Sequence, residues 1–209
     1  MSLTLILTEI GTTSMEEFIL RRSYVYYNLD PGNYETSAIG YVKVLIDQGN
    51  SKIPASQTNP TKQPILSYSK HTGRNYIQFD GERQMTSNID LNMDGSLVTA
   101  FVVYRLDSFQ DGHYLFRNGL FGNDNLGWDK FVCFTTNRDL IISGVDSANK
   151  HLKFSTFLNT TINPSSTGTW KVLSVQWKVN ATGDSSVWYN GKLLARFSSY
   201  AVEADTKVA

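Results

Sequence analysis

The segment best suited to bind a small polar ligand runs from position 117 to position 129, where amide, carboxylate, guanidinium and indole side chains alternate with glycines. Sugars present hydroxyl groups that pair with Asp, Asn and Arg, and apolar C–H faces that lie on an aromatic ring. The candidate ligand-binding residues are Arg117, Asn118, Asp124, Asn125, Trp128 and Asp129. The alternative interpretation is a Gly- and Asn-rich connection whose Trp128 packs on the rim of a sheet.

Catalytic motifs are absent from the sequence. It contains no Gly-x-Ser-x-Gly elbow, no His-Glu-x-x-His pair, no phosphate-binding Gly-rich loop and no Gly-x-Gly-x-x-Gly fingerprint. The histidines at positions 71, 113 and 151 are scattered, and none adjoins a candidate nucleophile. We therefore expect a protein without enzymatic activity.

The composition limits the partners of the chain. Its 209 residues carry 19 basic and 19 acidic side chains, a formal net charge of zero, so neither nucleic acid nor an anionic membrane is an expected partner. No stretch approaches the roughly 20 apolar residues of a membrane span. The apolar run Leu3–Leu7 lacks a basic leader, so we expect no signal peptide, which leaves the localisation undetermined, with a virion or cell-surface assembly as one option.

One helix is predicted, near the N-terminus. Ser14 and Glu17 have the spacing of a capping box, and a short helix over about residues 15–22 would follow. From Tyr24 onward, short β-branched and aromatic runs are divided by Gly, Asn, Asp and Pro, the pattern of an all-β sandwich. The expected organisation is an arm over 1–23 and one globular domain over 24–209.

Several strands can be placed on this pattern. Asn190-Gly191 between two apolar runs predicts a hairpin, because these residues tolerate the positive φ angles of a type I′ turn. Ser96–Leu106 is apolar on both faces and is expected in the middle of a layered sandwich. Gln48–Thr72 holds three prolines and is expected to be a long surface loop. Cys133, within Phe131–Phe134, is expected to be a small buried hydrophobe in a strand.

Strand Trp170–Val179 is expected to turn one face to the core. Its odd-numbered positions from 173 onward are Leu173, Val175, Trp177 and Val179, and its other face carries Val172, Ser174, Gln176 and Lys178. Trp170 and Trp177 fall on opposite faces, and such tryptophans are more often packing residues than ligand platforms. A functional tryptophan would be one on a concave sheet with Ser174 and Gln176.

Four segments, taken in order, resemble a known superfamily. They are Tyr27–Asp30 with Val42–Asn50, Gln63–Leu66 with Tyr76–Gly81, Leu97–Tyr104, and Gly168–Val172 with Val187–Lys192. Their order resembles the concanavalin A-like, laminin-G-like jelly-roll domains of the lectin and glucanase superfamily, especially those of bacterial, phage and viral surface proteins. The resemblance implies an all-β jelly-roll sandwich of two antiparallel sheets, here with one short N-terminal helix.

The resemblance also directs attention to calcium and to glycoside hydrolysis. Calcium is the usual cofactor of lectins on this fold, and its oxygen ligands could come from Asp124, Asn125 and Asp129, or from Asp90, Asn92 and Asp94. Ordinary turn chemistry is the alternative for both clusters. The paired glutamates of laminarinase-like enzymes, in a Glu-x-Asp-x-x-Glu pattern, have no counterpart in this chain.

Two functions remain open on this basis. The first is a lectin-like recognition module that binds a glycan or other surface ligand through the sandwich loops. The second is a structural or assembly protein of a phage or virion surface, associating with copies of itself or with virion proteins through an open sheet edge. Members of the resembling subgroup have a further strand after the Asn-Gly hairpin, and we expect the run Leu3–Ile10 to supply it, within the chain or to a neighbouring copy.

Overall fold

The fold is given by a computed structural model. The structure describes residues 2–3, 26–89, 97–108, 119–122, 131–134, 139–142, 152–154, 164–178 and 181–199. These residues form antiparallel sheets, which confirms the all-β class. The helix expected over 15–22 lies outside them. Among the described residues, no helix is long and apolar enough to cross a membrane.

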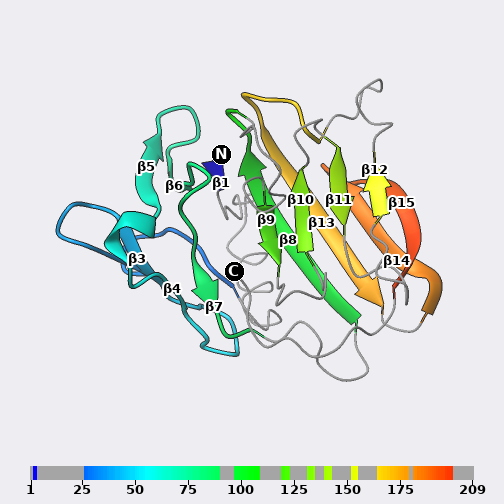
Figure 1. The fold of residues 1–209 in the computed structure, drawn as a ribbon, viewed down its shortest axis with the longest axis horizontal. Helices are drawn as coiled ribbons and strands as arrows, with labels where there is room; N and C mark the ends of the chain where they lie inside the picture. Colours follow the sequence, from blue (N-terminus) through cyan, green and yellow to red (C-terminus); the bar gives the residue numbers. More distant parts are fainter. Residues whose placement is uncertain are drawn as a thin grey trace.

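The strands between residues 34 and 87 build a small lobe, which we define as residues 26–89 (Figure 1). Its elements are β2 (Tyr34–Thr36), β3 (Val42–Leu45), β4 (Ala55–Ser56), the 3-10 helix η1 (Pro60–Lys62), β5 (Ile65–Ser69), β6 (Arg74–Gln78) and β7 (Thr86–Ser87). They pair in the order β2-β3-β4-β7 and as the hairpin β5-β6. Their shared core consists of Leu29, Val42, Leu45, Ala55, Ile77 and Met85.

The expectation of one long loop over Gln48–Thr72 is wrong. This segment contains β4, η1 and β5, and β5 pairs with β6 over its whole length. The prolines do not interrupt the strands, because Pro60 opens η1 and Pro64 precedes the first residue of β5. Both are places where a missing N–H costs no ladder hydrogen bond.

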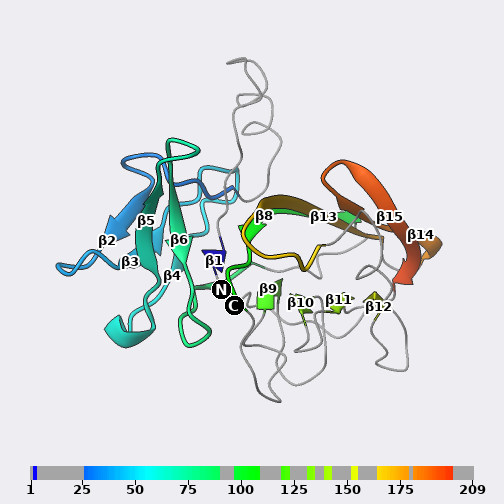
Figure 2. The same ribbon diagram turned by 90° about the horizontal axis from the view of Figure 1, so that it is seen from above.

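The other strands form a two-layered sandwich (Figure 2). One layer has the order β1-β8-β13-β14-β15, and the other has the order β12-β11-β10-β9. Their bounds are β1 (Ser2–Leu3), β8 (Leu97–Arg105), β9 (Gly119–Gly122), β10 (Phe131–Phe134), β11 (Leu140–Ile142), β12 (Leu152–Phe154), β13 (Trp170–Lys178), β14 (Ala181–Tyr189) and β15 (Lys192–Ser199). We call these strands the sandwich.

The core of the sandwich is built from the facing sides of both sheets. Its buried members include Val102, Tyr104, Phe134, Ile142, Leu173, Val175, Trp177 and Val187. The predicted inward face of β13 is confirmed at Leu173, Val175 and Trp177. Cys133 on β10 is buried as expected, and this burial raises the pKa of its thiol to about 12.

Strand β8 fits the prediction of cover on both faces only in part, since Val103 on the face away from the core is 7% exposed. Val102 and Tyr104 point into the core, but Phe101 on the opposite face is 58% exposed. The described second sheet covers only the inner face of the five-stranded sheet, as Figure 2 shows. Its outer face therefore meets solvent at Phe101, and an apolar side chain there is available for contacts.

The predicted hairpin is confirmed. Asn190 and Gly191 join β14 to β15 with φ angles of 46° and 78°. At the other end of the same sheet, β1 pairs with β8, with Ser2 opposite Arg105 and Leu3 opposite Tyr104. The N-terminal end thus adds a strand within the chain, on the edge of the sheet away from β15. Positions 4–10 of the predicted run lie outside the described residues.

Candidate functional site

The sequence-predicted ligands fall outside the described part of the chain. This holds for Arg117, Asn118, Asp124, Asn125, Trp128 and Asp129, and also for the calcium candidates Asp90, Asn92 and Asp94. Within the described ranges, no group of three or more His, Cys, Asp or Glu side chains could hold a metal ion.

Three tryptophans have well-defined surroundings. Trp177 is fully buried in the sandwich core, where its ring meets that of Phe121 edge-on at 6.1 Å. Trp188 lies on the outer face of β14, opposite Ser174, and is 37% exposed. Trp170 lies at the start of β13, on the face that carries Ser174 and Gln176, and is half-buried. Trp170 and Trp188 thus lie on the sheet face that carries Ser174 and Gln176.

Trp170 belongs to a group of side chains where the small lobe meets the sandwich. We call it the junction cluster, and it consists of Asp30, Arg74, Tyr76, Arg105, Asp107 and Trp170. Strand β1 contacts both β6 and β8 and so lies between the two parts that supply these residues (Figure 1). All six side chains are half-buried or exposed, so a ligand in solution can reach them.

The middle of the junction cluster is aromatic. Tyr76 of β6 and Trp170 of β13 meet edge-on, with their ring centroids 5.7 Å apart and their planes at 74°. Arg105 pairs with Trp170 across the β8–β13 ladder. Its guanidinium carbon is 5.2 Å from the Trp170 centroid and 5.6 Å from that of Tyr76. A guanidinium at this distance is attracted by the ring faces.

Asp107 fixes the guanidinium of Arg105. Arg105 donates from Nε to Asp107 Oδ1 at 2.8 Å and from Nη2 to Oδ2 at 3.1 Å, so the pair is bidentate. The hydrogen bonds to Asp107 raise the pKa of Arg105. Such a fork holds the plane of the guanidinium in one orientation against the two rings.

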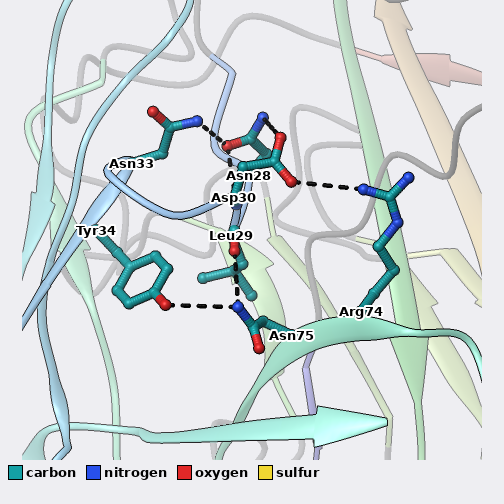
Figure 3. Close-up of polar contacts among 7 residues, drawn as sticks. All are labelled: Asn28, Leu29, Asp30, Asn33, Tyr34, Arg74 and Asn75. Atoms are coloured by element: carbon teal, nitrogen blue, oxygen red, sulfur yellow. Dashed lines mark hydrogen bonds and ion pairs between the residues drawn. The ribbon is translucent and has the colours of Figure 1, made fainter. Parts of the chain in front are cut away.

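The other end of the junction cluster is a second ionic pair, shown in Figure 3. Arg74 Nη1 is 3.5 Å from Asp30 Oδ1, and Asn28 Nδ2 donates to Asp30 Oδ2 at 3.0 Å. Asn33 in turn donates from Nδ2 to Asn28 Oδ1. This chain of amides holds the Asp30 carboxylate toward Arg74, and Arg74 shares one face of β6 with Tyr76, about 7 Å along the strand.

Asn75 anchors the strand from its opposite face. Its Nδ2 donates to the Leu29 carbonyl at 3.2 Å and to the Tyr34 hydroxyl at 3.5 Å, and Figure 3 shows it pointing away from Arg74. Ile77, on this same face, is buried in the small-lobe core. Because the inner face of β6 is fixed in this way, Arg74 and Tyr76 are held toward the solvent side.

The junction cluster combines donors, acceptors and apolar ring surface. The guanidinium groups donate, the carboxylates accept, and Tyr76 and Trp170 offer ring faces and edges. Its six side chains include no thiol, imidazole or aliphatic hydroxyl that could act as an activated nucleophile. The arrangement is thus suited to hold a polyhydroxylated ligand with an apolar face.

Sequence patterns give only part of this site. Strand alternation places Tyr76 and Ile77 on opposite faces of one strand, and Trp170 and Trp177 on opposite faces of another. The outward orientation of Tyr76 and Trp170 is therefore predictable from the sequence. The Arg105-x-Asp107 spacing at the end of a strand is too common in sequences to mark a ligand site. The approach of Tyr76 to Trp170 joins residues 94 positions apart and has no local signal.

Comparisons with known proteins do not assign a family. No family model matches the chain, and no curated protein or solved structure matches it significantly.

Proposed function

We propose that the protein is a non-enzymatic, lectin-like recognition module that binds a glycan at the junction cluster. The observation that carries this proposal is the half-buried Tyr76–Trp170 pair, flanked by the Arg105–Asp107 and Arg74–Asp30 pairs. A sugar ring has the matching chemistry, because its C–H face lies on an aromatic ring while its hydroxyls exchange hydrogen bonds with charged groups.

The fold proposal that accompanies this function is a concanavalin A-like jelly roll. Two antiparallel sheets share one core, and the predicted strands over residues 97–106 and 170–178 are neighbours in the larger sheet. These features support the resemblance. The loop residues Arg117–Asp129 and the calcium candidates remain predictions for a second part of the ligand site.

A glycan array probed with the full chain tests the function, followed by calorimetry on the best ligand. We expect Trp170→Ala to weaken binding by about twofold to tenfold, since an aromatic contact contributes about 0.5–1.5 kcal/mol. Trp188→Ala is the matched control, because Trp188 lies on the same sheet face, opposite Ser174 and about 13 Å along β13 from Trp170.

Thermal unfolding of both variants separates binding from packing. If Trp170→Ala lowers affinity while its melting temperature stays close to that of Trp188→Ala, the junction cluster contacts the ligand. Equal affinities for the two variants, or no glycan bound by the wild type, would remove the junction cluster as the binding site.

A second function, assembly through protein contacts, is favoured by a stripe of exposed apolar side chains. Phe101, Ser174, Trp188 and Leu193 face one another in a row across β8, β13, β14 and β15. The three apolar members are 58%, 37% and 41% exposed. Contiguous exposed apolar surface commonly marks interaction sites. Light scattering on the wild type and on Phe101→Ser tests the assembly function. An assembly protein would form an oligomer that the substitution weakens.

A further inference from the structure

We propose that the glycan bound at the junction cluster is electrically neutral, carrying no carboxylate, sulfate or phosphate group. This inference rests on the proposed function and adds the class of ligand. Its basis is that each arginine of the junction cluster is paired with an aspartate, so the two basic and two acidic groups sum to zero formal charge.

The Arg105–Asp107 pair leaves little room for an anionic ligand. Asp107 uses both of its carboxylate oxygens on Arg105, at 2.8 and 3.1 Å. A ligand carboxylate that binds the Nε and Nη2 edge of Arg105 would have to displace Asp107, and one that binds the other N–H groups would lie near the Asp107 carboxylate. The first loses two charge-assisted hydrogen bonds, and the second places like charges side by side.

The Arg74–Asp30 pair imposes the same restriction at the other end. Asp30 Oδ1 faces Arg74 and Oδ2 accepts from Asn28, so the carboxylate is held in place by its neighbours. Its side chain is 46% exposed, so an incoming anion would meet its negative charge. An incoming anion therefore meets a carboxylate beside each of the two arginines.

Among the described residues, Lys171 is a further cation whose charge interacts with Asp107, but its side chain is turned away from this face. Lys171 follows Trp170 on β13 and points to the inner side of the sheet, where its Nζ donates to the carbonyls of Ser166 at 2.5 Å and Thr169 at 3.0 Å. It is buried, with its ammonium 5.6 Å from the ring of Tyr104. It cannot contact a ligand held on Tyr76 and Trp170.

Neutral sugars suit these ion pairs. A vicinal diol can donate to a carboxylate oxygen and accept from a neighbouring guanidinium N–H, so that the pair stays intact while both hydroxyls are satisfied. The rings of Tyr76 and Trp170 contact Arg105, and Tyr76 lies two residues from Arg74 on β6, so a hexose resting its C–H face on these rings would be near both ion pairs.

The test compares neutral and acidic glycans on the full chain. Arrayed neutral oligosaccharides are matched with uronate, sialylated and sulfated counterparts, and the best neutral and acidic members are titrated by calorimetry at low salt. We expect the wild type to prefer the neutral member by about tenfold or more. Asp107→Asn removes one negative charge and frees the Arg105 fork, and should shift this preference by about tenfold toward the acidic member.

Asp80→Asn is the matched control. Asp80 also pairs with an arginine, Arg83, at 2.8 Å, but Arg83 stacks on Tyr41 and not on the junction cluster. We expect the control to leave the preference unchanged, and exposed pairs of this kind contribute little to stability, so both variants should fold. Folding is verified by thermal unfolding.

The outcomes separate the two proposals. A wild type that prefers acidic glycans, or equal preferences for Asp107→Asn and Asp80→Asn, overturns the neutral-ligand inference and leaves the lectin function standing. A wild type that binds no glycan of either class overturns the lectin function and the inference together.

Discussion

Asn190 and Val172 exchange two hydrogen bonds between the β14–β15 turn and the central strand β13. The backbone N–H of Asn190 donates to the Val172 carbonyl at 2.8 Å, and Asn190 Oδ1 accepts from the Val172 N–H, also at 2.8 Å. A residue in the left-handed region thus continues the ladder between β13 and the hairpin. The same β13 carries Trp170 of the junction cluster, two residues before Val172.

Substitutions at Gly191 and Asn190 distinguish two contributions to stability: the positive φ of the turn and the hydrogen bond from the Val172 N–H to Asn190 Oδ1. Gly191→Ala places a side chain at a φ of 78° and should lower the free energy of unfolding by about 1 kcal/mol. Asn190→Gly keeps the positive φ but loses the Val172 contact, and should cost about 0.5–1.5 kcal/mol. Urea unfolding measures both. If Asn190→Gly matches the wild type, the side-chain bond contributes nothing.

Asp47 should be the most sensitive carboxylate of the small lobe. It is buried and accepts from the backbone N–H groups of Tyr26 and Gly49 at 2.7 Å and of Ile53 at 3.0 Å, and from the Ser51 hydroxyl. Asp47→Ala leaves these donors without their acceptor and should cost about 2–5 kcal/mol in urea unfolding.

The control for Asp47 is Asp80→Asn, which alters an exposed ion pair and should cost about 0–1 kcal/mol. A loss for Asp47→Ala no greater than that of this control would show that the loop after β3 is held in another way.

Trp177 of β13 and Trp188 of β14 should differ in their effect on stability. Trp177 is fully buried in the sandwich core, so Trp177→Ala should lower the free energy of unfolding by about 3–5 kcal/mol. Trp188 is partly exposed on the outer face, and Trp188→Ala should cost about 1 kcal/mol or less. Equal losses in chemical unfolding would contradict the assignment of inner and outer faces.

Lys171 should make stability depend on pH. Burial lowers its pKa from 10.5 to about 8, so the unfolded chain binds more protons between these values, and this contribution to stability rises with pH across that window. In the same range Tyr27 and Cys133, whose pKa values burial raises to about 12, act in the opposite direction. The comparison with Lys171→Met cancels them.

We therefore expect the stability of the wild type relative to Lys171→Met to rise between pH 8 and 10.5, with a slope of at most about 1.4 kcal/mol per pH unit. Urea unfolding of both proteins at several pH values measures it. A relative stability that is flat or falls over this range would mean that the Lys171 ammonium is not disfavoured by folding.

The sequence alone determined the features that depend on neighbouring residues. Asn190-Gly191 defines the hairpin because few other pairs accept two positive φ angles, and alternation places Leu173, Val175 and Trp177 on one face of β13. Both predictions use spacings of a few residues, and folding did not override them. The repeated short strand patterns after Tyr24 likewise predicted the all-β class, which the described sheets confirm.

The tertiary structure decided what distant segments do together. Composition predicted a loop over Gln48–Thr72. Strand β5 forms there nevertheless, because it pairs with β6 and because the prolines of the segment lie outside this ladder. The apolar pattern of β8 predicted cover on both faces, yet on the outer face Val103 is buried while Phe101 is 58% exposed. In both cases pairing and layering, which local sequence does not encode, set the outcome.

The junction cluster shows the same division. Alternation turns Tyr76 and Trp170 outward, but their contact depends on how the small lobe meets the sandwich beside β1. Loop-based reasoning pointed instead to Arg117–Asp129, because a run of Asp, Asn and Trp is visible in one stretch of sequence. A site assembled from β6, β8 and β13 has no such run, since its residues meet only when the strands are in register.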